Sequence, residues 1–283
     1  MRKIIVNGEY FSVKDTALCG QLFRYFPIEN KSGAYFINSG DKRCLAYNDK
    51  NDAVIECNEE DEEYFNNYFD LARDYSEIVN AANAQGGIIA KAGELGKGVR
   101  ILNQNRAESL FSFIVSQNNN IPRIKVIIER LCHGAGKKHE FYGEEYYAFP
   151  TAEELSVKPL EFFKEIGLGY RAEYIKRLAD NFSATFNERD FDLLPTAELK
   201  KKLVGIYGVG PKVADCVSLF GFHRADSFPV DTWIEKVYRD DLKGTQKDRT
   251  KIAEECTAKF GANAGYFQQY LFYYKRSLEK DGK

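Results

Sequence analysis

The sequence predicts an α+β protein in which an N-terminal antiparallel sheet is followed by an all-helical domain. The first 55 or so residues carry short apolar bursts broken by Gly, Asn and Asp, which is typical of strands and turns. From about residue 60 onward, apolar residues recur three or four positions apart, the period of amphipathic helices. A length of 283 residues with 44% hydrophobic and 29% charged residues indicates a globular chain of one or two domains.

Strand-like segments come first, and helix-like segments follow them along the chain. The predicted strands lie in KIIVNGEYF, GAYFINSG, KRCLAYN and AVIEC. The helical pattern begins at LARDYSEIVNAA and continues through the final AGYFQQYLFYYKRSL, and it predicts about eight to ten helices in the second domain. Glycines cluster at 86–98, so we place the boundary there, with domains at 1–95 and 96–283.

Two segments carry the signal of a helix start. In PTAEEL at 150–155, Thr151 is a predicted N-cap and Glu154 follows three residues later, which together form a capping box. In PTAEL at 195–199, Thr196 is a second predicted N-cap.

Charge is distributed unevenly between the two predicted domains. Residues 1–95 contain 10 Lys and Arg against 16 Asp and Glu, whereas residues 96–283 contain 30 against 26. The overall charge of −2 argues against nucleic-acid binding by bulk electrostatics alone, and an anionic partner should meet the second domain. The chain shows neither a signal peptide nor a membrane span, and its six cysteines lack C-x-x-C spacing, which predicts reduced thiols.

The segment GIYGVGPKVADC at 205–216 predicts a tight turn between two helices. Gly208 and Gly210 allow a close approach of the backbone to a partner, and Pro211 suits the first helical position. Free N–H groups beside a helix N-terminus form a phosphate site. A Walker loop would need its lysine one position earlier than Lys212, and a dinucleotide loop would need another glycine, so both are excluded. A plain turn with a solvated Lys212 is the simpler alternative.

Asp231 lies 19 residues after Lys212, in the segment FPVD that precedes a predicted helix. As the N-cap of that helix, it needs no further role. The intervening helix and turn would also return its carboxylate to Lys212. A neutral amine in an apolar pocket forms Schiff bases, and a nearby carboxylate takes up protons and stabilises positive charge. The pair therefore predicts a catalytic site, with a simple cap as the alternative.

Together these segments resemble the helix–hairpin–helix (HhH-GPD) DNA glycosylases, and in particular the branch of 8-oxoguanine DNA glycosylases with AP lyase activity. The resemblance covers most of the chain, in CGQLFRY (19–25), FSFIVSQNNNIPRI (111–124), IGLGYRAEYI (166–175), GVGPKVADC (208–216), FPVD (228–231) and AGYFQQYLF (264–272). It implies an HhH-GPD helical domain and a base-excision repair enzyme that excises 8-oxoguanine, preferably opposite cytosine, from duplex DNA.

The resemblance also implies residue roles. Lys212 would attack C1′ of the damaged nucleotide and form a Schiff base whose β-elimination nicks the strand, while Asp231 would support the amine and the positively charged sugar. The base must leave the stack for this chemistry. The implied contacts are Gly20, Cys216, Gln268 and Phe272 for the base, Asn118, Arg123, Tyr170 and Arg171 for the opposite base and the wedge, and Gly208, Gly210 and Val213 for the DNA backbone.

Several of these residues also have a structural alternative. Either arginine, Arg123 or Arg171, taken alone is the kind of residue that forms surface ion pairs. Cys216 and Phe272 are ordinary helix-core residues, and Gln268 lies in an aromatic-rich final helix of the kind that is more often core.

The resemblance further implies a cation at the hairpin, Na⁺, K⁺ or Ca²⁺, held by the backbone carbonyls of Val204, Ile206 and Val209. Trp233 stands where animal members tend to carry a histidine that contacts a phosphate, so that contact is in doubt. The iron–sulfur cysteine pattern of another branch is absent, and no redox cofactor is expected.

Two other hypotheses stay open. The first is a relative that removes alkylated purines or oxidised pyrimidines, although alkyl-purine branches generally lack the hairpin lysine. The second is a non-catalytic hairpin module that grips phosphates, with Lys212 as a phosphate contact and Asp231 as a cap. We further expect a monomer in a bacterial cytoplasm, associated with the nucleoid and not with a membrane.

Overall fold

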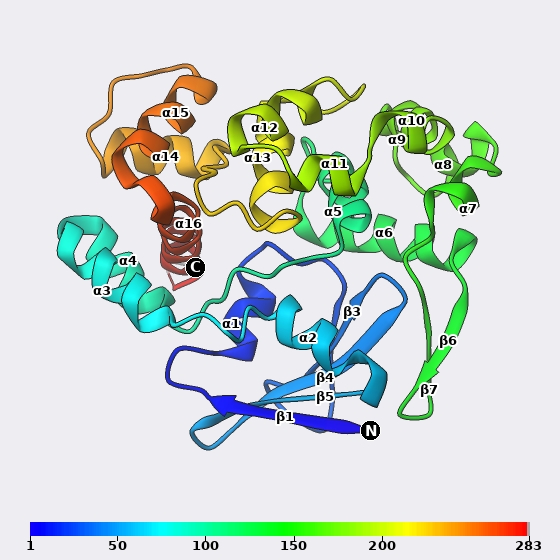
Figure 1. Cartoon of the computed structure of the whole chain (residues 1–283), viewed down its shortest axis with the longest axis horizontal. Helices are drawn as coiled ribbons and strands as arrows, with labels where there is room; N and C mark the ends of the chain where they lie inside the picture. Colours follow the sequence, from blue (N-terminus) through cyan, green and yellow to red (C-terminus); the bar gives the residue numbers. More distant parts are fainter. Residues whose placement is uncertain (282–283) are drawn as a thin grey trace.

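The computed structural model describes residues 1–281, with an antiparallel sheet at one end and helices at the other (Figure 1). The five strands are β1 (Arg2–Asn7), β2 (Tyr25–Pro27), β3 (Tyr35–Ser39), β4 (Lys42–Asp49) and β5 (Asp52–Cys57). They pair antiparallel in the order β1-β5-β4-β3-β2, so the predicted fold class and sheet are confirmed.

Two-residue hairpins set the register of the central strands. Ser39 lies opposite Lys42, and Gly40 between them has a φ of 59°. Asp49 lies opposite Asp52, and Lys50 has a φ of 53°. Positive φ in a two-residue loop matches the twist of the flanking strands, so these turns fix which side chains of β4 face the core.

One apolar cluster joins the sheet to the helices that cover it. Its members are buried residues of the strands, of the segment before α1 (Val13–Leu18) and of α2 (Glu62–Tyr68), and they include Phe11, Ile37, Ala46, Ile55, Phe65 and Tyr68. The 3₁₀ turn η1 (Glu59–Asp61) leads into α2. Burial of this apolar surface holds the sheet together as one layer.

Helices make up most of the remaining chain. They are α3 (Tyr75–Gln85), α4 (Gly87–Gly96), α5 (Arg106–Val115), α6 (Ile121–Ala135), α7 (Ala152–Ser156), α8 (Leu160–Glu165), α9 (Arg171–Asp180), α10 (Phe182–Thr185), α11 (Glu188–Asp192), α12 (Thr196–Val204), α13 (Pro211–Phe220), α14 (Thr232–Asp240), α15 (Arg249–Phe260), the 3₁₀ turn η2 (Gly261–Asn263) and α16 (Ala264–Asp281). The described part of the second predicted domain thus holds twelve helices, not eight to ten, because α7, α8, α10 and α11 span only four to six residues each.

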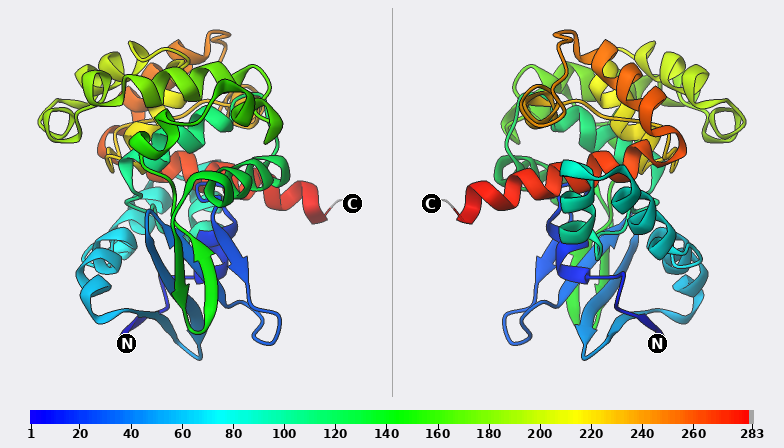
Figure 2. Two further views of the ribbon diagram at one scale, coloured as in Figure 1. Left: turned by 90° about the vertical axis from the view of Figure 1, so that its right-hand side faces the viewer. Right: turned by 90° about the vertical axis from the view of Figure 1, so that its left-hand side faces the viewer.

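A β-hairpin interrupts the helices and was not predicted from the sequence. Its strands are β6 (Lys138–Phe141) and β7 (Glu144–Tyr147), and they extend beside the N-terminal sheet (Figures 1 and 2). Phe141 and Tyr146 pack on Phe36 of β3, and the Tyr146 hydroxyl donates to the carbonyl of Asp41 at 2.8 Å. The hairpin therefore ties the helical part of the chain to the sheet.

The glycine-rich segment 86–98, which we took as the boundary, forms helix α4. This helix packs against α16, and a Cβ atom at Gly96 would lie 2.8 Å from Cδ1 of Tyr270. Tyr75, Ile78 and Ile89 accordingly belong to the same apolar cluster as the C-terminal helix. Helices α3 and α4 thus pack against a helix of the second predicted domain, although both precede the predicted boundary. The division at 95/96 itself stays a prediction.

The predicted caps are observed with one exception. Thr151 and Glu154 form the expected capping box. Thr196, in contrast, is the first residue of α12, and Pro195 is its N-cap. The prediction was wrong because the Thr196 hydroxyl has a tertiary partner: it donates to Oδ1 of Asp226 at 2.8 Å. Among residues 1–281, no helix combines the length and the hydropathy that crossing a membrane requires.

Candidate active site

The predicted hairpin is present between α12 and α13. Helix α12 ends at Gly205, and α13 begins with Pro211 in its first turn. Gly208 has a φ of 88°, and a Cβ atom there would lie 2.5 Å from Cγ of Tyr174. Only glycine fits at this position, because both the backbone angle and the tyrosine ring exclude a side chain. The ring of Tyr174 thus packs directly on the hairpin backbone.

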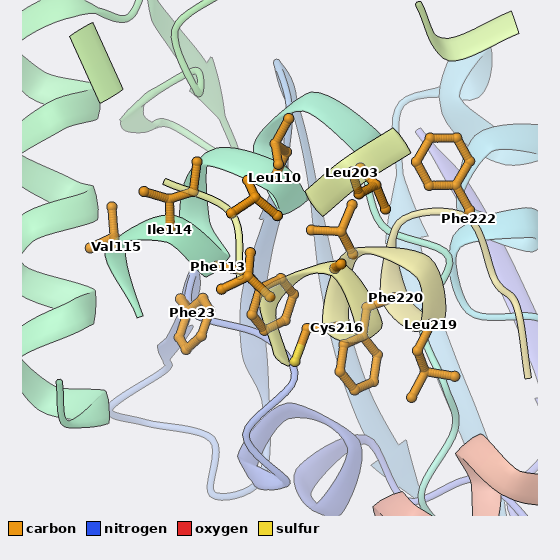
Figure 3. Close-up of a cluster of buried hydrophobic side chains, with 14 of the residues drawn as sticks. Phe23, Leu110, Phe113, Ile114, Val115, Leu203, Cys216, Leu219, Phe220 and Phe222 are labelled. Atoms are coloured by element: carbon orange, nitrogen blue, oxygen red, sulfur yellow. The ribbon is translucent and has the colours of Figure 1, made fainter. Parts of the chain in front are cut away.

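Lys212 is the second residue of α13, and its side chain lies partly buried beside an aromatic ring. Its Nζ is 5.4 Å from the ring centroid of Phe113, on α5. Cys216 follows one helical turn later, and Figure 3 shows it in the apolar cluster that also holds Phe23 and Phe113. The amine therefore projects from the N-terminal end of α13 toward an apolar wall.

Asp231 is the N-cap of α14, as predicted. Its Oδ1 accepts the backbone N–H groups of Trp233 and Ile234, each at 2.9 Å, and no described residue forms a hydrogen bond with its Oδ2. The preceding residues Phe228 and Val230 are buried, so the segment between α13 and α14 turns back into the core. Capping therefore fixes the carboxylate without using both of its oxygens.

Lys212 and Asp231 both act on the thiol of Cys216. Burial raises the pKa of this thiol to about 11, the charge of Lys212 opposes the rise, and the charge of Asp231 adds to it. Both charges thus act on one buried group, although the two residues are 19 positions apart in the chain. The pairing of the amine with the carboxylate stays a prediction.

Three of the four predicted base contacts, Gly20, Gln268 and Phe272, lie where α16 meets the loop after α1. Gly20 has a φ of 96°, and a Cβ atom there would lie 2.9 Å from Cε1 of Phe272. Gln268 lies one helical turn before Phe272 and is only 5% exposed. Its Oε1 is buried, and within residues 1–281 it has no hydrogen-bond partner. A buried amide oxygen without a partner is costly unless a ligand supplies one.

Gln269 is a neighbour of this site that the sequence did not single out. It is 2% exposed, and its Nε2 donates to the carbonyl of Cys19 at 3.0 Å. This bond fixes α16 against the loop that carries Gly20. Its position next to Gln268 was the only signal in the sequence.

Three of the residues predicted to contact the opposite strand gather on an exposed rim. Asn118 has a φ of 45°, and its Nδ2 lies 3.4 Å from the hydroxyl of Tyr170. Tyr170 is 50% exposed, as a wedge requires. Arg123 is also exposed, and its Nη2 donates to the carbonyl of Gly167 at 3.3 Å.

Arg171, unlike Arg123, is buried. It is 5% exposed, and its Nε donates to the carbonyl of Gln117 at 2.8 Å. Its Nη2 donates to the carbonyls of Gln117 and Asn118, and its Nη1 to that of Leu168. Most of its donors are thus used to hold the Asn118 loop.

Gln117, which sequence reasoning missed, links that loop to the hairpin. Its side-chain Nε2 donates to the carbonyl of Gly208 at 2.9 Å, while its own carbonyl accepts from Arg171. The only sequence signal was its position directly before the three asparagines.

The hairpin positions predicted for DNA and for a cation lie on one short turn. The space around a Cβ atom at Gly210 is open, with no atom within 4 Å, and the N–H of Val213 belongs to the first turn of α13. The carbonyl of Ile206 accepts the N–H of Val209 at 3.0 Å, which folds 204–209 tightly. Trp233 lies partly buried at the start of α14.

Asp215, a buried carboxylate three residues after Lys212, is another residue that sequence reasoning missed. It is 4% exposed, and its Oδ1 lies 2.6 Å from Nζ of Lys200 on α12. Burial raises its pKa to about 6, and Lys200 and then Lys212 oppose the rise. The ion pair crosses from α12 to α13 and so braces both ends of the hairpin.

A glycine hairpin followed by a lysine and, after the next helix, by a capping aspartate, in a helical domain joined to a small sheet, defines the helix–hairpin–helix class of DNA repair proteins. Residues 111–261 match the HhH-GPD superfamily of base excision DNA repair proteins, and residues 3–110 match the N-terminal domain of 8-oxoguanine DNA glycosylase. The first match covers more than half of the chain. The chain belongs to the HhH-GPD superfamily.

Individual proteins show the same similarity. The chain is 32% identical to N-glycosylase/DNA lyase OGG1 of Arabidopsis thaliana, over 62% of this chain and 52% of the relative. It is 37% identical to the N-glycosylase/DNA lyase of Saccharomyces cerevisiae, over 52% of this chain and 43% of the relative, so it spans about half the length of these two relatives. The solved 8-oxoguanine glycosylase/lyase of Clostridium acetobutylicum, in complex with dsDNA containing cytosine opposite to 8-oxoG, is 38% identical. Its TM-score is 0.91, over 98% of this chain and 96% of that chain.

Proposed function

We propose that this chain is a bifunctional DNA glycosylase and AP lyase that excises 8-oxoguanine from duplex DNA. The observation that carries the proposal is the position of the Lys212 amine, partly buried beside Phe113 in the first turn after the glycine hairpin, with Asp231 held as the N-cap of the next helix. An amine next to an aromatic wall and a carboxylate with one unused oxygen are the two groups that Schiff-base chemistry needs. The similarity to named N-glycosylase/DNA lyases agrees with this chemistry.

In the proposed reaction, the neutral amine of Lys212 attacks C1′ of an extruded nucleotide. The glycosidic bond breaks, and the base leaves with its bonding electrons and takes up a proton. Ring opening of the bound sugar gives an imine at C1′, and loss of a proton from C2′ expels the 3′ phosphate, which nicks the strand. The carboxylate of Asp231 stabilises the positive charge that builds on the sugar.

Base recognition would use the pocket around Gly20. We assign its carbonyl, which accepts no hydrogen bond from any described residue, to the N7–H that distinguishes 8-oxoguanine from guanine. The partnerless oxygen of Gln268 would accept from the N–H groups on the pairing edge of the base. Phe272 and Cys216 would cover the two faces of the ring.

The exposed rim would meet the strand opposite the lesion. Tyr170 would occupy the space that the base leaves, and Asn118 and Arg123 would hold the partner base, with cytosine preferred because its ring carbonyl and nitrogen accept from arginine. Arg171 would act mainly by holding the Asn118 loop, with one remaining N–H for the base.

The hairpin would bind the DNA backbone through the N–H groups of Gly208, Gly210 and Val213. The tight turn at 204–209 fits a structural cation, for which Val204, Ile206 and Val209 would supply carbonyl oxygens. Such a cation would neutralise an adjacent phosphate. We propose that the chain acts as a monomer, since each of these contacts comes from one chain.

Borohydride trapping tests the proposal. Incubated with a duplex containing 8-oxoguanine opposite cytosine and reduced, the wild-type chain should form a covalent protein–DNA adduct. Lys212→Gln should form none while still binding the lesion, and Lys91→Gln, at an exposed lysine on α4, should trap as the wild type does. If no adduct forms on this duplex but one forms on a duplex with an alkylated purine or an oxidised pyrimidine, the substrate is that other lesion. If no adduct forms on any of these duplexes, the chain is a non-catalytic module that binds phosphates.

A further inference from the structure

One face of α16 carries a third side chain into the predicted base pocket. Gln268, Phe272 and Arg276 follow one another at intervals of four residues, so they lie in a row along the helix. A Cβ atom at Gly20 would lie 2.8 Å from Nη1 of Arg276 and 2.9 Å from Cε1 of Phe272. The guanidinium carbon of Arg276 is 5.3 Å from the ring centroid of Phe272. The guanidinium therefore lies against the same glycine that bounds the pocket.

Arg276 has no acceptor for its donors among the side chains that the structure describes, those of residues 1–278. It is partly buried, yet none of these side chains accepts a hydrogen bond from it or forms an ion pair with it. Two acidic groups that contact neighbouring residues of α16 have other partners: Asp15 accepts from the hydroxyl of Tyr273 at 2.6 Å, and Asp241 pairs with Lys275 at 3.1 Å. A partly buried guanidinium with five N–H donors and no acceptor is suited to a ligand that brings one.

We propose that Arg276 is a specificity-determining substrate contact, which donates a hydrogen bond to an exocyclic carbonyl oxygen of the extruded purine. This inference rests on the proposed function, because it concerns the same base pocket. Guanine-type bases present a carbonyl oxygen at C6, whereas adenine-type bases present an amino donor at that position. A guanidinium has donors only, so it bonds to the carbonyl and rejects the amino group.

A base contact accounts for the position of Arg276 better than a contact with a DNA phosphate does. Its guanidinium lies against Phe272, which is proposed to stack on the base, and against Gly20, which is proposed to read the N7 edge. The three contacts would then reach three different parts of one flat ring. A phosphate contact requires no such alignment with Gln268 and Phe272.

Two substitutions at Arg276 and one beside it form the test. Arg276→Met removes the donors but keeps a long apolar stem over Phe272, and Arg276→Lys restores one charged donor. Lys275→Met is the matched control, since it removes the same charge from the adjacent residue, which pairs with Asp241 and not with the pocket. Thermal melting of all variants establishes that each is folded.

The readouts are single-turnover excision and lesion affinity, the latter measured in a Lys212→Gln background. We expect Arg276→Met to lose on the order of 10- to 100-fold in affinity for an 8-oxoguanine:cytosine duplex relative to an undamaged duplex, the effect of one charge-assisted hydrogen bond. Arg276→Lys should recover part of this loss, and Lys275→Met should show none. Comparison with 8-oxoadenine identifies the atom: a loss confined to 8-oxoguanine indicates O6, and a loss on both bases indicates O8.

Two results would overturn the inference. An equal loss of affinity on damaged and undamaged duplexes, with a shallower salt dependence, would make Arg276 a phosphate contact. Unchanged excision and unchanged lesion affinity in Arg276→Met would remove it from recognition altogether. In both cases wild-type excision of 8-oxoguanine would leave the proposed function intact, whereas a wild-type chain that excises no 8-oxoguanine would overturn both proposals.

Discussion

The buried ion pair between Asp215 and Lys200 predicts a specific pH dependence of stability. Asp215 is 4% exposed, and burial raises its pKa from 3.8 to about 6 even though Lys200 and Lys212 oppose the rise. Glu254 adds to the rise from α15. The folded protein thus holds a proton on this carboxyl more tightly than the unfolded chain does.

The sign and size of the effect follow from linkage. A group whose pKa is higher in the folded state stabilises the fold fully below the unfolded value and loses that contribution as pH rises through the folded value. A rise from 3.8 to about 6 corresponds to about 3 kcal/mol. Asp215→Asn removes the titration while keeping the shape, so the stability of the variant relative to the wild type should increase by about this amount between pH 4 and pH 7.

Urea unfolding of the wild type and Asp215→Asn at intervals from pH 4 to pH 7 measures this difference. Lys200→Met should move the transition to higher pH, because it removes the cation that opposes the rise. Asp49→Asn, at the exposed last residue of β4, is the control and should give a flat difference. A flat difference for Asp215→Asn as well would refute the reasoning, since it would mean that burial does not shift this carboxyl.

Two further predictions concern the hairpin and the cap. Asp231→Asn preserves an N-cap oxygen but removes the charge. The excision rate should therefore fall on the order of 10²- to 10⁴-fold, while lesion affinity stays nearly unchanged. A large loss of affinity in a binding titration would instead make Asp231 mainly a structural cap. Gly208→Ala should destabilise the fold by at least about 2 kcal/mol and weaken binding to any duplex. Its new methyl group would clash with the ring of Tyr174, and the backbone φ of 88° is strained for any residue other than glycine. Thermal melting checks this, and addition of Tyr174→Ala should recover part of the loss; no recovery would locate the cost in the backbone angle alone.

Local chemistry explains which features were predictable from the sequence. Thr151, Pro211 and Asp231 lie where their own segments dictate, because capping and the first helical turn involve only neighbours in the chain. Thr196 failed as a cap because its hydroxyl bonds to a residue 30 positions away. The hairpin β6–β7 was missed because its turn uses Tyr142 and Gly143, both at positive φ, within a segment that is short and highly charged.

Within the site, the sequence identified candidate residues but not their burial or their hydrogen-bond partners. Asp231 was placed correctly as an N-cap, whereas its pairing with Lys212 stays a prediction. The burial of Arg171 and the bonds of Gln117 depend on how α9 packs against the Asn118 loop, and no pattern within either segment encodes that. Arg276 became visible only when the positions of Gly20 and Phe272 were known.

Gln117 links the Asn118 loop and the hairpin, which under the proposed function would face different DNA strands. Its carbonyl is anchored by Arg171, and its amide is bonded to the hairpin turn that precedes Lys212. Displacement of either loop is therefore transmitted to the other through a single side chain. A mismatched partner nucleotide would in this way slow the chemistry without touching the lesion, so that checking of one strand governs cutting of the other.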